Sequence, residues 1–170
     1  MIKTAIAIFK GSQQTRDAIE EIQGGSLANS KLSVIVRSEF IQQGEFREEI
    51  ASELAYYPSE LNLDKFNGWL VQAPPFDVPN LGEVVVAGPL ASELMHQAQG
   101  QGFVEALIGY GVSGIRARHY EHEVRTGHWL VLAQTHQEKI NKLANTLQSY
   151  GGRDIEKWST NIEHPIYPLG

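Results

Sequence analysis

The N-terminal part of the chain alternates between short apolar runs and a longer amphipathic stretch. Residues 2–9 are apolar and rich in isoleucine, which is typical of a buried central strand. Apolar residues then recur at helical spacing at Ala18, Ile19 and Ile22. We predict that Ser12 caps this helix and that Gly24-Gly25 ends it in a left-handed backbone. Residues 32–36 form a second apolar run, so this part reads as a β-α-β unit.

The C-terminal part follows the same plan. Residues 129–133 are apolar and predict a strand. Thr135 and Glu138 have the spacing of a capping box, which predicts the start of a helix. The apolar face of this helix consists of Ile140, Leu143, Ala144 and Leu147. Gly151-Gly152 is expected to stop the helix, and residues 154–159 to form a closing strand.

Two β-α-β halves predict an α+β fold. Halves of this kind, with their helices on one face of an antiparallel sheet, form a ferredoxin-like domain. We therefore predict one domain over residues 1–170, with a large insertion over residues 39–127 between the halves. The insertion is expected to contain a strand and helices that pack on the same domain.

The first half of the insertion carries weak signals. Apolar residues recur at helical spacing at Phe46, Ile50 and Leu54. This predicts a helix that ends before Pro58. Residues 58–82 are rich in proline, so we expect extended and largely irregular backbone. We interpret the apolar Trp69 and Phe76 as covering for the core, with an interface to another subunit as the alternative.

The second half of the insertion is more regular. Residues 83–87 predict a strand, and Gly88-Pro89 starts a helix with proline at its favoured first position. Residues 103–108 form a short apolar run that fits either a strand or a helix. Ser113 is expected to cap a last helix, which runs to Gly127.

Three glycines of the insertion match a dinucleotide-binding fingerprint. Gly109, Gly111 and Gly114 have the G-x-G-x-x-G spacing, which lets a pyrophosphate approach the N-terminus of a helix. That mechanism also requires an acidic residue at the end of the next strand, and residues 133–135 contain none. We favour structural glycines at a helix junction, and nucleotide binding is the alternative.

A polar cluster lies in the last helix of the insertion. His119 and Glu123 are four residues apart, so they share a helix face and could hold a metal ion, with His122 beside them. Positive charge surrounds them, at Arg116, Arg118 and Arg125. The apolar stripe of the helix consists of Ala117, Tyr120 and Val124. We therefore favour a solvated, salt-bridged helix and predict no metal site.

Composition narrows the possible classes of function. The chain has 170 residues, 42% of them hydrophobic and 20% charged, which suits a soluble globular protein. It contains no cysteine, which excludes disulfides and thiolate chemistry. The net charge of −6 argues against nucleic-acid binding. No apolar stretch is long enough to span a membrane, and the first residues do not resemble a signal peptide, so we expect a cytoplasmic protein.

Three segments together resemble a known family. Residues 87–91 read Ala-Gly-Pro-Leu-Ala, and residues 105–112 read Glu-Ala-Leu-Ile-Gly-Tyr-Gly-Val. Residues 120–127 begin Tyr-Glu and end in glycine. In this order they are similar to the bacterial general stress protein 17M-like family of heat-induced proteins. The likeness covers residues 84–135, whereas residues 39–80 depart from the family's pattern. It implies a stress-associated cytoplasmic protein and supplies no catalytic residues.

These observations lead to two expectations about function. The first is a non-enzymatic protein without a cofactor that acts by self-association, as a homodimer, or by binding a partner through the open face and edges of its sheet. The alternative is a small-molecule or nucleotide-binding protein, or an enzyme, that uses a cleft between the sheet and the inserted helices. Five residues are candidates for that cleft or interface: Gly88, Pro89, Gly109, Gly111 and Tyr120.

Overall fold

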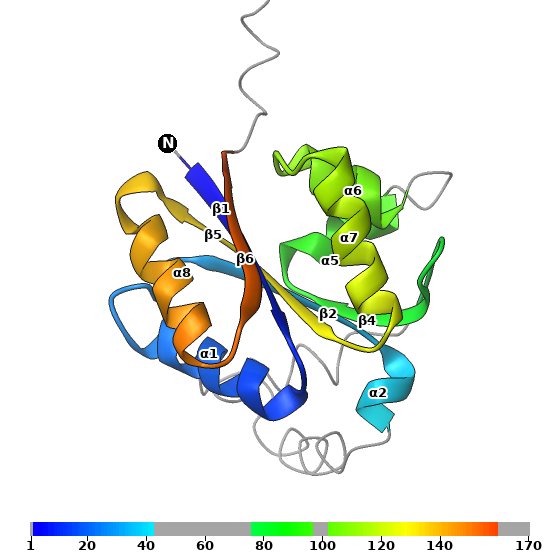
Figure 1. Ribbon diagram of the computed structural model, residues 1–170, viewed down its shortest axis with the longest axis horizontal. Coiled ribbons are helices and arrows are strands. Elements are labelled where there is room, and N and C mark those ends of the chain that lie inside the picture. Colours follow the sequence, from blue (N-terminus) through cyan, green and yellow to red (C-terminus); the bar gives the residue numbers. More distant parts are fainter. Residues whose placement is uncertain (1, 43–75, 97–101, 160–170) are drawn as a thin grey trace, which may run out of the picture.

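The computed structural model describes residues 2–42, 76–96 and 102–159. These residues form an α+β fold with a six-stranded antiparallel sheet in the order β3-β4-β2-β5-β1-β6 (Figure 1). The strands are β1 (Ile2–Phe9), β2 (Lys31–Arg37), β3 (Phe76–Val78), β4 (Gly82–Ala87), β5 (Trp129–His136) and β6 (Arg153–Ser159). The helices are α1 (Ser12–Gly24), α2 (Ser38–Gln42), α5 (Pro89–His96), α6 (Phe103–Gly109), α7 (Gly114–Arg125) and α8 (Ile140–Ser149).

Strand β1 lies between β5 and the edge strand β6, and it confirms the first predicted strand. Its residues 5–9 are fully buried, and both sides of the strand face apolar layers. It pairs with β5 along its whole length, from Ile2 opposite His136 to Phe9 opposite Trp129. Its other edge pairs with β6. A strand buried on both faces needs a continuous apolar run, which is what the sequence shows.

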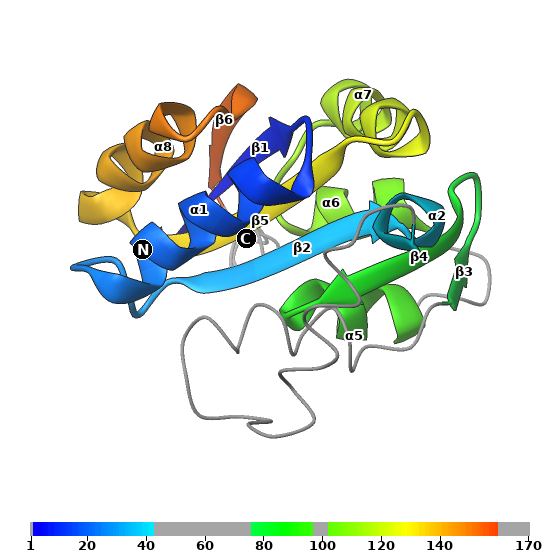
Figure 2. The same ribbon diagram turned by 90° about the horizontal axis from the view of Figure 1, so that it is seen from below.

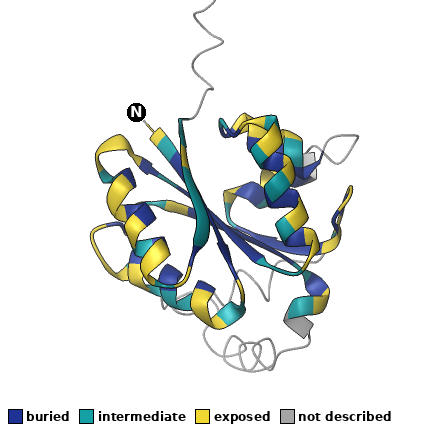
Figure 3. Ribbon diagram, viewed as in Figure 1, coloured by how far each residue is buried: buried dark blue, intermediate teal, exposed yellow. Residues whose placement is uncertain are grey.

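Helices cover both faces of the sheet, and the helices of the two β-α-β units share one face, as predicted. Helices α1 and α8 pack on one face through Ile19, Ile22 and Leu143. Helices α5, α6 and α7 pack on the other face through Leu90, Leu107 and Tyr120, among other residues. Figure 2 shows helices on both sides of the sheet, and Figure 3 shows the exposed residues on the outer sides of the helices. The helices of the predicted insertion cover the face that we expected to be open.

Three predicted helix caps are wrong. The N-cap of α1 is Gly11, and Ser12 is already helical. Gly25, after α1, has an extended backbone with φ −127° rather than a left-handed one. Thr135 belongs to β5, which continues to His136, and Glu138 lies in a 3-10 turn (Gln137–Lys139) before α8. Strand pairing with β1 extends β5 into the first half of the predicted capping box, through Thr135 and His136.

Most of the second half of the insertion follows its prediction. Strand β4 and helix α5, with Pro89 at its first position, are confirmed. The apolar run at residues 103–108 is helical, as α6, and Ser113 caps α7 by accepting a hydrogen bond from the Arg116 N–H. Phe76 belongs to β3, whereas Trp69 and the helix predicted near Ile50 lie outside the described residues. Among the described residues, no helix has the length and apolar character that crossing a membrane requires.

Candidate functional site

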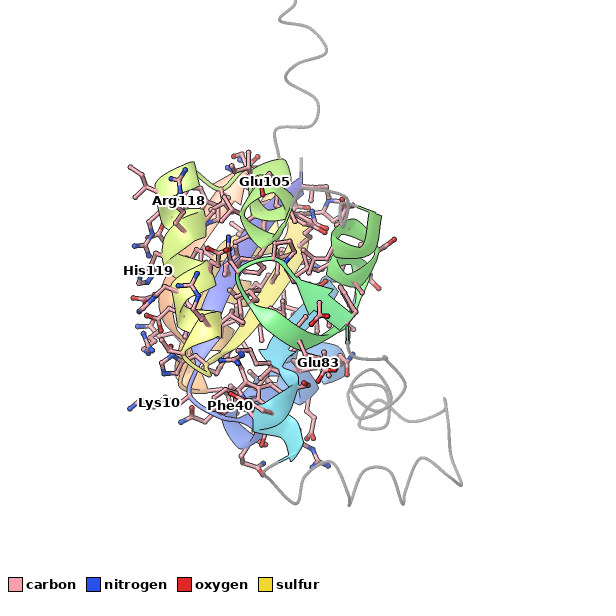
Figure 4. The ribbon with its side chains drawn as sticks, turned by 90° about the vertical axis from the view of Figure 1, so that its right-hand side faces the viewer. Lys10, Phe40, Glu83, Glu105, Arg118 and His119 are labelled. Atoms are coloured by element: carbon pink, nitrogen blue, oxygen red, sulfur yellow. The ribbon has the colours of Figure 1, made fainter. Side chains whose placement is uncertain are left out.

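Helix α7 and strand β6 bring together five titratable side chains, which we call the charged cluster: His119, Glu123, His128, Arg153 and Asp154. His119 Nε2 lies 3.0 Å from Asp154 Oδ2. The same carboxylate oxygen accepts a hydrogen bond from Arg153 Nη1 at 3.0 Å. His119 lies on the outer side of α7, beside Arg118 (Figure 4). The side chains of His119 and Asp154 are each 33% exposed, so solvent reaches this half of the cluster.

Glu123 forms the less exposed half of the charged cluster. Its side chain is 14% exposed, and its Oε1 accepts a hydrogen bond from Arg153 Nη2 at 2.8 Å. His128, in the turn between α7 and β5, places Nδ1 2.9 Å from the same oxygen. Arg153 therefore bridges the two carboxylates of the cluster, one from each element. Its planar guanidinium suits this role, because it presents several N–H donors in fixed directions.

Local structure on both elements creates the cluster. On α7, the spacing of four residues places His119 and Glu123 on one face. On β6, pairing with β1 shifts between Ile6 opposite Glu156 and Ile8 opposite Arg153, which is a β-bulge. Asp154 lies in this bulge with φ 54°, a left-handed conformation that is uncommon outside glycine. The bulge holds the Asp154 carboxylate against α7.

Tyr120 is a buried residue of α7 that contacts the backbone of the charged cluster. Its side chain is fully buried, and its hydroxyl donates a hydrogen bond to the Asp154 carbonyl oxygen at 2.8 Å. The guanidinium of Arg116 lies 5.4 Å from the centre of the Tyr120 ring, within the range of a cation–π contact. Burial, followed by the negative charge of Glu156, raises the pKa of Tyr120 to about 12. Tyr120 therefore stays protonated and keeps its hydrogen bond at neutral pH.

The charged cluster also contains a possible set of metal ligands. Donor atoms of His119, Glu123 and Asp154 lie within 4.8 Å of one another, and imidazole and carboxylates are zinc ligands. However, the Arg153 guanidinium already contacts both carboxylates, so a metal ion would have to displace it. This arrangement supports our interpretation of a salt-bridged helix. The sequence did not indicate Arg153 and Asp154 as members, because nothing in the closing strand predicts a bulge.

The charge of Asp154 is expected to stabilise the fold in a pH-dependent way. A hydrogen bond from His119 is the main cause that holds the pKa of Asp154 below 3.8, and the Arg153 charge adds to it. A carboxyl with a lowered folded-state pKa stabilises the fold above its unfolded pKa and loses this effect as the pH falls through the folded pKa. Asp154→Asn keeps the left-handed backbone, which asparagine tolerates, and replaces the charged carboxylate with a neutral amide of similar shape.

We expect Asp154→Asn to lower the free energy of unfolding at about pH 7 by only about 0.5 kcal/mol, because partly exposed ion pairs contribute little. The difference from the wild type should shrink as the pH falls from about 4 towards 2. Urea unfolding at a series of pH values measures it. A difference that stays constant over this range would mean that the Asp154 charge has no part in it.

The five residues singled out from the sequence lie in two places on the same side of the sheet. Gly88 joins β4 to α5, which begins at Pro89. Gly109 ends α6, and Gly111 lies between α6 and α7. Tyr120 follows on α7. Buried apolar side chains fill the layer between these helices and the sheet. The element before Gly109 is a helix, so the strand that the dinucleotide fingerprint needs does not precede it.

The described residues place no hydroxyl nucleophile in hydrogen-bond contact with His119. Thr126 Oγ1 does lie 3.2 Å from His128 Nδ1, but it also donates a hydrogen bond to the Glu123 carbonyl oxygen. The hydrogen bonds and ion pairs of the cluster therefore connect α7 to β6, which is a structural role. Comparisons of the chain with protein-family models, with curated proteins and with solved structures found no match.

Proposed function

We propose that this chain is a non-enzymatic protein with a ferredoxin-like core that acts by self-association, as a homodimer. The strand order β2-β5-β1-β6 supports the ferredoxin-like core, because two interleaved β-α-β units produce this order. Helices α1 and α8 belong to these units and pack on the same face of the sheet, which fits the same arrangement. The resemblance of residues 84–135 to general stress proteins supports a stress-associated role.

The pairing within the charged cluster supports a role without catalysis. A general base needs a free acceptor close to the proton that it takes, and a nucleophile needs a base beside it. Here the Asp154 and Glu123 carboxylates are both held by Arg153. The alternative of a ligand between the sheet and α5–α7 has less support, because apolar side chains fill that layer.

The observation that carries the proposal is the position of β6 at the edge of the sheet. This strand has seven residues, and its one neighbour among the described strands is β1. The strand at the other edge, β3, has three residues. Since helices cover both faces of the sheet, the outer side of β6 is the longest edge on which a second copy can continue the sheet.

The charges of β6 select one register for such a dimer. A twofold axis at Glu156 places Glu156 opposite its own copy and Ile155 opposite Lys157, and Arg116 already lies 2.9 Å from Glu156 to offset the repulsion. An axis at Ile155 would place Asp154 opposite Glu156, and an axis at Lys157 would place two lysines together. Like charges directly opposite each other destabilise a strand pair. The axis at Glu156 also opposes two like charges, but it is a single pair that Arg116 offsets, whereas the axis at Ile155 opposes several like charges. Of these three registers we therefore choose the axis at Glu156.

Substitutions at Glu156 test the proposal. Glu156→Lys places two lysines and two arginines around the axis, and we expect it to weaken the dimer by about tenfold or more, since like charges in an interface are costly. Glu156→Gln removes the repulsion with little change of shape and should leave the dimer intact or strengthen it. Size-exclusion chromatography with light scattering over a concentration series measures both. A wild-type protein that is monomeric at every concentration would rule out self-association.

A further inference from the structure

A pocket of about 350 Å³ lies at the end of the sheet where β1 begins and β5 ends. The loop between α1 and β2, residues 26–30, forms one wall, and the turn before α8 forms another. Figure 2 shows these segments at the same end of the molecule. The pocket is remote in the fold from the charged cluster, which occupies α7 and the start of β6. Its volume falls within the range of pockets that bind small molecules.

The loop wall of the pocket is held in place by its own contacts. The Ala28 N–H donates to the Gly25 carbonyl oxygen at 3.1 Å, and the Ser30 N–H donates to the Leu27 carbonyl oxygen at 2.9 Å. The Leu27 side chain is 4% exposed and packs into the layer under α1 and α8. The pocket is therefore formed by an anchored loop and by strands that are paired with each other.

The ionisable side chains that line this pocket are all basic. Lys31, His136 and Lys139 line it, and no lining residue is an aspartate or glutamate. This is notable in a chain whose net charge is −6. Lys139 Nζ donates to the Ser26 carbonyl oxygen at 3.1 Å, and Lys142 Nζ donates to Ser26 Oγ. Within the described residues, no carboxylate forms an ion pair with these three lysines.

The pocket also has an apolar part. Ile2, at the start of β1, is 36% exposed and lines the pocket together with Leu27. This surface combines an exposed isoleucine with lysines that form no ion pair among the described residues. Lysine ammonium groups bind carboxylates and phosphates as point charges, and apolar side chains bind hydrocarbon.

We propose that this pocket binds a small amphiphilic anion, with a carboxylate or phosphate head and a short apolar chain. Lys31, His136 and Lys139 surround the head, and Ile2 and Leu27 contact the chain. The inference goes beyond self-association, because the pocket lies at one end of the sheet and the proposed dimer forms along the outer side of β6.

Isothermal titration with four probes tests the two chemistries separately. Octanoate and octyl phosphate carry both features, octanol carries only the chain, and inorganic phosphate carries only the charge. We expect at least one of the two octyl anions to bind, and to bind about tenfold or more tightly than octanol and inorganic phosphate, because only they use both parts of the pocket. The stronger of the two anions identifies the head group. Binding of neither anion, or equal binding of octanol, would overturn the proposal.

Variants that replace a lysine of the pocket with glutamate test whether the octyl anions bind there. We expect Lys139→Glu to weaken binding of the octyl anions by about tenfold or more, because a repulsive charge replaces an attractive one. Lys10→Glu makes the same change next to the opposite end of β1 and should leave binding unchanged; Figure 4 shows Lys10 in the lower part of the molecule. Lys31→Glu is the second variant if Lys139→Glu does not fold. Equal affinity in folded Lys139→Glu or Lys31→Glu and wild type would contradict this site.

Discussion

Gly88→Ala is expected to destabilise the protein by about 3 kcal/mol or more, because backbone strain and overlap with the backbone add together. Gly88 has φ 91°, a conformation that side chains other than glycine rarely adopt. A Cβ atom there would lie 2.1 Å from the Leu32 carbonyl oxygen and 2.8 Å from the Ser33 Cα. Both atoms belong to β2, which is paired on both sides, so the strand cannot move away easily.

Gly109→Ala is the matched control for this prediction. A Cβ atom at Gly109 would meet no other atom within 4 Å, and this residue closes helix α6. We expect Gly109→Ala to leave stability unchanged or to raise it by up to about 1 kcal/mol, since alanine favours helices over glycine. Urea unfolding followed by circular dichroism compares the two variants. A Gly88→Ala variant as stable as the wild type would contradict the close approach of Gly88 to β2.

Tyr120→Ala is expected to lower the free energy of unfolding by about 3–5 kcal/mol, as large aromatic truncations in cores do. Among the described residues, Tyr120 is the largest fully buried side chain, and it packs with Leu107, Leu130 and Leu132 in the layer between the sheet and α5–α7. The substitution leaves a cavity there and removes the support of Asp154. A loss of this size approaches the whole stability of many domains, so the variant should be partly unfolded at room temperature.

Tyr120→Phe separates packing from hydrogen bonding. It keeps the ring and removes only the hydroxyl that donates to the Asp154 carbonyl oxygen, and we expect it to cost about 1 kcal/mol. Chemical denaturation of the three proteins gives the two contributions by difference. Equal losses in Tyr120→Phe and Tyr120→Ala would show that the ring contributes little, which would contradict the observed burial.

The strands could be predicted from the sequence because their apolar runs reflect burial on both sides. Residues 2–9 and 83–87 are recognisable for this reason, and the structure confirms both strands. The capping box at Thr135 was misleading because a local motif competes with strand pairing. Pairing with β1 continues to the end of β5 and leaves Thr135 in the strand. A single sequence does not show which of the two interactions is stronger.

The charged cluster could be predicted only in part. The helical spacing indicated that His119 and Glu123 share a face, and the nearby arginines indicated salt bridges. Its partners Arg153 and Asp154 come from a strand that is distant in sequence, and a β-bulge positions them. The same limitation explains why we expected one face of the sheet to be open. The pattern of residues 103–125 shows an apolar helix face, but it does not show which face of the sheet the helices cover.

Hydrogen exchange of the β6 amides at low and high protein concentration tests the central claim most directly. In the proposed dimer, the outer N–H groups of β6 donate to a second copy. Their protection should therefore rise with concentration, while protection in the inner strands β1 and β5 stays constant. Protection of β6 that is the same at every concentration, with exchange as fast as at a solvent-exposed edge, would contradict self-association through this strand.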